Sequence, residues 1–178
     1  MIIDFFIRRK TKEQMAETKQ MLFAKNLVCV CVEQVKDGDF SGILYHQYAD
    51  DPVAFTSAAD FLLKMEELMD EWDFPQRGLA ERFFKKEARD NSGKHYLLKE
   101  GDDRLPIEII QDMNGVRNVQ NKKGTLGTFV VQVVFRQDAT WQGHVIHQEK
   151  NEKKDFRSAL ELVKYMDSSI NQQNQEAR

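Results

Sequence analysis

The chain has 178 residues and a mass of 20.8 kDa, which suits one ordinary domain or two small, tightly joined halves. Its formal net charge is −3 and its sequence pI is about 5.9, unlike the high pI typical of a nucleic-acid-binding domain. Two cysteines and no apolar run of membrane-spanning length exclude a disulfide framework and a transmembrane helix, so we expect a soluble, cytoplasmic protein.

The first predicted elements are a strand at residues 2–7, an amphipathic helix at 11–24 and a β-branched strand at 27–33. Asp37 and Gly38 follow, and this dipeptide predicts the tight turn of a hairpin. We expect the returning strand at residues 40–47.

A helix is predicted to begin at Ser57. Ser57 and Asp60 have the spacing of a capping box, in which the hydroxyl and the carboxylate each accept a bond from an unpaired backbone N–H. Apolar residues at helical spacing follow, and Asp73-Phe-Pro-Gln76 is expected to end this helix.

The middle of the chain is predicted to connect two similar parts. It contains a short basic helix at residues 79–88 and a strand at 95–99. A further strand is expected at residues 107–110, after Pro106, and a polar loop at 114–127.

An internal repeat is the strongest pattern in the sequence, because residues 27–70 and 128–171 match at a constant offset of 101 positions with no gap. Both copies contain a glycine two residues after an aromatic, and both contain a capping box. We expect the ring of that aromatic, Phe40 or Trp141, to lie over the bare backbone of the glycine. The identical pairs are Val30/Val131, Val32/Val133, Asp37/Asp138, Gly42/Gly143, His46/His147, Gln47/Gln148, Phe55/Phe156, Ser57/Ser158, Ala58/Ala159 and Met65/Met166.

These patterns together predict an α+β fold: two duplicated strand–strand–helix units that form a two-layer α/β sandwich with a shared core. Residues 1–72 would hold the first unit with the strand and helix before it. Residues 73–105 would form the inter-repeat connection. Residues 106–178 would hold the second unit and a polar tail that frays after residue 170.

Histidine and cysteine do not form an obvious metal site. His46 and His147 are equivalent in the repeat, whereas His144 lies on the opposite face of its strand from His147 and cannot easily share an ion with it. Cys29 and Cys31 point the same way along one strand and are best interpreted as buried small hydrophobic residues. We therefore predict no metal and no cofactor.

Motifs for nucleophilic catalysis, phosphate binding and dinucleotide binding are absent from the sequence. Asp50 and Asp51 lie in a predicted turn, where solvation outweighs acid–base chemistry. Phe40 and Trp141 could stack on nucleic-acid bases, but no pattern of flanking basic residues accompanies them, so core packing is favoured. The sequence predicts no catalytic residue and no enzyme activity.

Two strings of the second copy, Phe135-Arg-Gln…Trp141-Gln-Gly and Phe156-Arg-Ser-Ala-Leu-Glu-Leu, resemble a family of short clostridial proteins from gut bacteria. Gly42-Ile-Leu-Tyr-His46 and Lys64-Met-Glu-Glu-Leu-Met-Asp70 are similar to the front half of the same family. No activity is known for that family. The resemblance implies a small accessory protein of phage or mobile-element type, and anti-CRISPR proteins are similar to this chain in size and acidity.

Charge distribution indicates two candidate surfaces. Residues 27–72 carry ten acids and two lysines, and such an acidic surface could bind the basic channel of a nucleic-acid enzyme. In this hypothesis Asp50, Asp51, Glu66 and Glu67 bind a protein or ribonucleoprotein partner; alternatively, the acids only keep the protein soluble.

The second hypothesis is a regulator that binds nucleic acid directly through basic residues. A basic patch of the predicted helix and the lysines of the polar loop would contact phosphates. These residues are Arg82, Lys85, Lys86 and Arg89 in the helix, and Lys122 and Lys123 in the loop.

Overall fold

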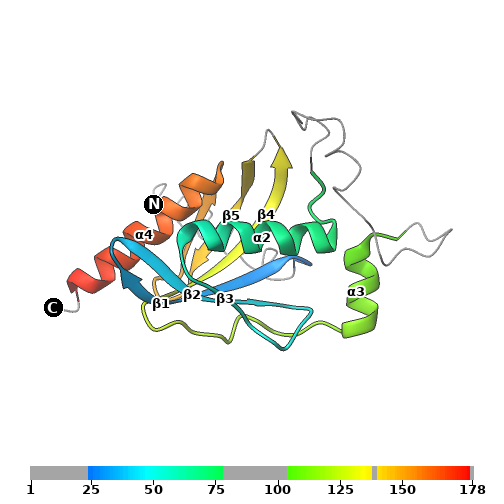
Figure 1. Ribbon diagram of the computed structural model, residues 1–178, viewed down its shortest axis with the longest axis horizontal. Coiled ribbons are helices and arrows are strands. Elements are labelled where there is room, and N and C mark those ends of the chain that lie inside the picture. The colour runs from blue at the N-terminus through cyan, green and yellow to red at the C-terminus, as the bar shows by residue number, and fades with distance from the viewer. Residues whose placement is uncertain (1–23, 78–103, 138–139, 177–178) are drawn as a thin grey trace, which may run out of the picture.

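The computed structural model describes residues 24–77, 104–137 and 140–176, which form an α+β fold around one six-stranded antiparallel sheet (Figure 1). The strand order is β3-β2-β1-β4-β5-β6. The elements are β1 (Leu27–Lys36), β2 (Asp39–His46), β3 (Val53–Phe55), α2 (Ala58–Trp72), α3 (Pro106–Asn114), β4 (Gly127–Gln137), β5 (Thr140–His147), β6 (Glu152–Phe156) and α4 (Ala159–Glu176).

Helices α2 and α4 cover the same face of the sheet (Figure 1). Their apolar stripes pack on alternate residues of the strands, because successive side chains of a strand point to opposite faces. One core cluster therefore contains Phe61 and Met65 from α2, Leu162 and Met166 from α4, and Val30 from β1, all of them 2% exposed or less.

The other face of the sheet has a smaller apolar cluster that includes Leu27, Cys29, Cys31 and Val130. The segment 115–126 runs along this side of the molecule (Figure 1), and its Val119 is buried in the cluster. We call this segment the strap. It explains why cysteines that point away from both helices are still buried.

The two hairpins pair in the same register. In the first, Cys31 lies opposite Ile43 and Val32 opposite Gly42, and the register shifts at a bulge immediately after Val32. In the second, residues 101 positions later pair in the same way, and the bulge follows Val133. In β1 and β4, at the centre of the sheet, Cys29 lies opposite its own repeat equivalent, Val130.

A phenylalanine ring packs over the repeated glycine in each half. A Cβ atom on Gly42 would lie 2.0 Å from the carbonyl oxygen of Cys31 and 3.0 Å from the ring of Phe55. A Cβ atom on Gly143 would meet Gln132 and Phe156 at the same distances. The rings belong to Phe55 and Phe156 of the following strand and not, as predicted, to Phe40 and Trp141. Glycine is required because backbone and ring together occupy the space of a side chain.

The predicted serine caps are present at both helix starts, but each acid binds the N–H of the residue before the serine rather than that of the serine itself. The hydroxyl of Ser57 accepts a hydrogen bond from the backbone N–H of Asp60 at 3.0 Å, and the Asp60 carboxylate accepts one from the N–H of Thr56 at 2.8 Å. Ser158 and Glu161 form the same arrangement at the start of α4. The serine hydroxyls satisfy N–H groups that a helix start leaves without a partner, and the carboxylates fix the chain just before each helix.

Several predictions of secondary structure need correction. Residues 107–110 belong to α3 rather than to a strand, because Pro106 starts a helix whose Ile107 and Ile110 are buried on one side. Each hairpin is followed by a short third strand, β3 or β6, that was not predicted. The polar tail is helical up to Glu176 instead of fraying after residue 170.

Other predictions fall outside the described residues. These are the strand at 2–7, most of the helix at 11–24, the basic helix at 79–88 and the strand at 95–99. Two observed features do match the sequence: Asp73 ends α2 in a left-handed conformation, and Asp37 and Gly38 adopt the positive φ of the predicted turn.

Candidate functional site

The outward face of α2 is an acidic stripe. Leu63, Glu67, Asp70 and Glu71 are exposed at helical spacing, and Leu63 is 63% exposed. We call these four residues the acidic stripe. Glu67 and Glu71 form no ion pair with another described residue, so both carboxylates are available to a partner.

The equivalent face of α4 lacks this charge. At an offset of 101 residues, Lys164, Ser168, Asn171 and Gln172 occupy the positions of the acidic stripe, and all four are exposed. Both helices pack on the sheet through similar apolar residues. The difference between the two helices is therefore concentrated on their solvent faces.

A buried arginine binds the inner edge of the acidic stripe. The Arg136 side chain is only 4% exposed, and its guanidinium donates to Asp70 at 2.5 Å and also to Glu66. Trp141 donates its indole N–H to Glu66, and Arg77 donates to Asp70 at 2.7 Å. Glu66, predicted to contact a partner, is thus engaged inside the chain.

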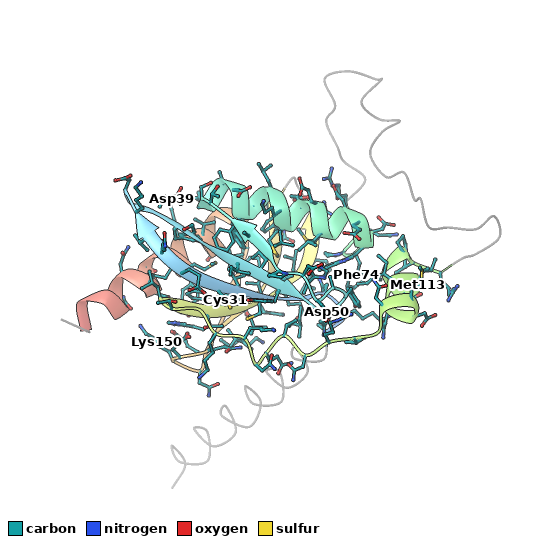
Figure 2. All side chains as sticks on the ribbon, turned by 60° about the horizontal axis from the view of Figure 1, so that its bottom comes forward. Cys31, Asp39, Asp50, Phe74, Met113 and Lys150 are labelled. Atoms are coloured by element: carbon teal, nitrogen blue, oxygen red, sulfur yellow. The ribbon has the colours of Figure 1, made fainter. Side chains whose placement is uncertain are left out.

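The other predicted acidic pair lies in the turn between β2 and β3. Asp50 is at the end of the molecule that holds α3, opposite the end that holds Asp39 (Figure 2). Arg117 of the strap binds Asp50 through two guanidinium nitrogens, and this hydrogen bonding lowers the pKa of the Asp50 carboxyl. Asp51 is exposed and forms no ion pair with another described residue. The contacts of Asp50 and of Glu66 are separate, so the four predicted residues do not share one network.

Little of the predicted basic surface lies in the described part of the chain. The helical patch of Arg82, Lys85, Lys86 and Arg89 is outside it. Lys122 and Lys123 are in the strap, where the Lys122 ammonium lies 4.7 Å from the centre of the Tyr45 ring and Lys123 is exposed.

The two repeated histidines pack against aromatic rings. His46 ends β2, and the centre of its ring lies 5.5 Å from the centre of the Trp72 ring. Its Nδ1 accepts a hydrogen bond from the Tyr48 backbone N–H at 3.3 Å. Burial, with a smaller effect of Arg117, lowers the pKa of His46. His147 is fully buried, and its ring stacks on that of Phe129 with 4.7 Å between the ring centres. His46 and His147 therefore both pack against aromatic rings, and no group of three or more metal-ligating side chains occurs among the described residues.

The cysteines and the large aromatics are core residues, as predicted. Cys29 and Cys31 are at most 1% exposed, and their Sγ atoms lie 4.0 Å apart. The hydrogen bond between the thiols, together with burial, raises the pKa of Cys29. Phe40 and Trp141 are 2% and 3% exposed, so neither ring is available to stack on a nucleic-acid base.

A groove between β6 and α4 was not predicted. It has a volume of about 280 Å³ and is open to solvent along the edge of the sheet. Its lining combines an apolar floor with charged walls, from Val145, Lys154, Asp155, Phe156, Glu161, Lys164, Tyr165 and Ser168. No strand was predicted at residues 152–156, so the groove beside β6 could not be predicted from the sequence.

Comparisons of this chain with protein-family models, curated proteins and solved structures find no match. The resemblance to the clostridial family therefore stays a prediction. Among the residues that the structure describes, no helix is both long enough and apolar enough to cross a membrane.

Proposed function

We propose that this chain is a non-enzymatic binding protein whose acidic stripe contacts a basic surface on a protein or ribonucleoprotein. The observation that carries this proposal is the difference between two helices in equivalent positions. Glu67, Asp70 and Glu71 on α2 stand where α4 has Ser168, Asn171 and Gln172. A requirement for solubility alone gives no reason to place the acids on one helix only.

An internal duplication of the fold is part of the same proposal. We infer that the two halves derive from one β-hairpin-and-helix unit, extended by the third strand of each half. Shared register, shared bulges and shared serine caps support this inference. A duplication supplies two equal helices, and changes confined to solvent-facing residues can specialise one of them without disturbing the core.

The class of partner follows from the charge. Carboxylates spaced along a helix present a row of negative charge, as phosphates do along a nucleic-acid backbone. A basic channel that binds nucleic acid is therefore a suitable target, and the protein would act as an inhibitor of such an enzyme, of the anti-CRISPR type. The exposed Leu63 adds an apolar contact beside the charges.

A matched pair of variants tests this proposal. Glu67→Lys with Glu71→Lys reverses the acidic stripe, and Ser168→Lys with Gln172→Lys adds the same charges to the equivalent positions of α4. Proteins retained by each variant and by the wild type from host lysate are identified by mass spectrometry, and inhibition of RNA-guided DNA cleavage is measured in parallel. We expect the α2 variant to lose its partner and the α4 variant to keep it, with association that weakens as salt rises.

Equal retention by the α2 and α4 variants would contradict the proposal. A mobility shift of DNA or RNA by the wild type at moderate salt, abolished by changes at Arg82, Lys85, Lys86 and Arg89, would instead support direct nucleic-acid binding.

A further inference from the structure

The strap is tied at its first end to the turn that joins β2 to β3. The backbone N–H of Arg117 donates to the Gln47 carbonyl at 2.8 Å, and the Arg117 guanidinium binds Asp50 through two nitrogens. The Asn114 side chain, just before the strap, donates to the Tyr48 carbonyl at 3.1 Å. All of these bonds end on the turn, so the conformation of the turn decides whether the first end of the strap is held.

His46 fixes the conformation of that turn. Its Nδ1 accepts the backbone N–H of Tyr48 at 3.3 Å, so this nitrogen carries no proton in the structure. A protonated imidazole donates from both of its nitrogens and accepts at neither. Protonation of His46 would therefore set two N–H groups against each other, and the turn would have to rearrange. The Tyr48 hydroxyl takes no part in weakly acidic solution, because burial raises its pKa to about 12.

The groups packed around His46 disfavour its charged form. β1 places Val28 opposite His46 in the sheet, and α2 places the Trp72 ring 5.5 Å from the His46 ring, centre to centre. The strap contributes the cation of Arg117, whose partner Asp50 stays ionised because the hydrogen bond from Arg117 lowers its pKa. Burial and, to a smaller extent, the charge of Arg117 lower the pKa of His46. The arginine that ties the strap is thus the cation that a charged His46 repels.

The far end of the strap is held at a different place. Leu126 donates its backbone N–H to the Val32 carbonyl of β1 at 2.9 Å. Between the two ends, Val119 is 3% exposed and packs on the apolar cluster that contains Cys29 and Cys31. Val119 lies two residues after Arg117, so movement of the first end carries Val119 away from the cluster while the far end stays attached.

We propose that the strap is a pH-sensitive cover, in which protonation of His46 releases the first end of the strap and uncovers the apolar cluster and the two thiols beneath it. Neutral His46 keeps the strap closed. Its contribution is fully present above about pH 6.5 and is lost as the pH falls towards the pKa that His46 has under the closed strap. The device needs no partner, so it stands or falls independently of the function proposed above.

The rate at which a dipyridyl disulfide labels the two thiols measures the opening. This reagent also reacts in acid, and dividing the rate in the folded protein by the rate in concentrated urea at the same pH removes the effect of pH on the thiols themselves. This ratio should rise roughly three- to tenfold from about pH 7.5 to about pH 5, since a pKa difference of one unit between the closed and open strap is worth a factor of ten.

Two histidine variants assign the effect. His46→Gln should show no rise, because the amide oxygen can accept the Tyr48 N–H at every pH. His144→Gln, at a histidine on the other half of the sheet, should show the same rise as the wild type. An unchanged ratio in the wild type, or an equal rise in His46→Gln, overturns the proposal.

Hydrogen exchange followed by NMR locates the opening in the wild-type protein. After correction for the intrinsic effect of pH, the Arg117 amide should exchange faster in acid, with a midpoint that coincides with titration of the His46 ring. The Leu126 amide should not follow it. Equal acceleration at Arg117 and Leu126 would indicate unfolding of the whole protein, and no acceleration at Arg117 would show that its bond to Gln47 persists; either result overturns the proposal.

Discussion

Trp141 donates its indole N–H to the carboxylate of Glu66, which joins the second half of the sheet to the helix of the first half. Arg136 reaches the same carboxylate from the neighbouring strand. The two halves are therefore connected by a polar contact at the edge of their common core. This contact also limits which acids of α2 remain available to a partner.

Replacing Arg136 with alanine should destabilise the protein by about 1–3 kcal/mol. Its guanidinium is buried, but Glu66 and Asp70 are 35% and 50% exposed, so water can solvate them after the change and the loss stays below that of a fully buried pair. Urea unfolding followed by circular dichroism measures the difference. Arg77→Ala, at a side chain that is 41% exposed, is the control and should cost less than about 1 kcal/mol. If Arg136→Ala and Arg77→Ala lower the free energy of unfolding equally, the burial of Arg136 does not increase its contribution to stability.

Gly42→Ala and Gly143→Ala should each destabilise the protein by about 2–4 kcal/mol. The added methyl group would lie 2.0 Å from a carbonyl oxygen of the neighbouring strand, so the strands must separate or the phenylalanine ring must move. Thermal unfolding of the two variants should give similar shifts, since the two sites have the same geometry. Gly38→Ala has open space around the new methyl group, and its positive φ should cost only about 1 kcal/mol. If Gly42→Ala lowers the stability no more than Gly38→Ala does, the backbone of Cys31 does not approach Gly42 as closely as the structure shows.

His46 should make stability depend on pH in the weakly acidic range. Its pKa in the folded protein lies below the usual 6.5, so the unfolded chain binds this proton more readily. The contribution of His46 is fully present above about pH 6.5 and declines as the pH falls towards the folded-state pKa.

Urea midpoints at about pH 7.5 and about pH 5 measure this dependence. His46→Gln should reduce the difference between the two midpoints. His144→Gln changes a partly exposed histidine and serves as the comparison. It should reduce the difference between the two midpoints less than His46→Gln does. If the difference between the two urea midpoints is the same in His46→Gln as in the wild type, other groups cause the pH dependence of stability.

Cys29 and Cys31 should resist modification in the native protein. Both are buried beneath the strap, so a reagent cannot reach either Sγ atom in the native protein. The hydrogen bond between the thiols raises the pKa of Cys29 and lowers that of Cys31, so the protection of Cys31 depends on its burial. Reaction with Ellman's reagent should be at least about 100-fold slower in buffer than in concentrated urea, because modification requires local opening. Fast native labelling would show that the strap opens readily.

Parts of this fold were predictable because they rest on local chemistry. The Asp37-Gly38 turn, the Ser57 and Ser158 caps and the alternation along the hairpins each depend on residues within a few positions of one another. Residues 107–110 were assigned wrongly because Ile-Glu-Ile-Ile is compatible with both a strand and a helix. The decisive fact is tertiary: the side of α3 that holds Ile107 and Ile110 packs into the core.

The candidate surfaces were harder to predict. The acidity of α2 is visible in the sequence, but Arg136, 66 and 70 residues away from its two acidic partners, decides which acids are engaged. Glu66 and Glu67 are adjacent and were predicted together, yet only Glu67 is left without an ion pair among the described residues. The groove depends on the approach of an edge strand to a helix, which no single segment encodes.

The central pairing of β1 with β4 has a consequence for synthesis of the chain. Val28 lies opposite Val131, about one hundred residues later, so the inner edge of β1 stays unpaired until the second half leaves the ribosome. At typical translation rates that interval lasts about 5–20 seconds. During this time the nascent first half presents an apolar β-branched edge, and it depends on delayed folding or on chaperones to avoid aggregation.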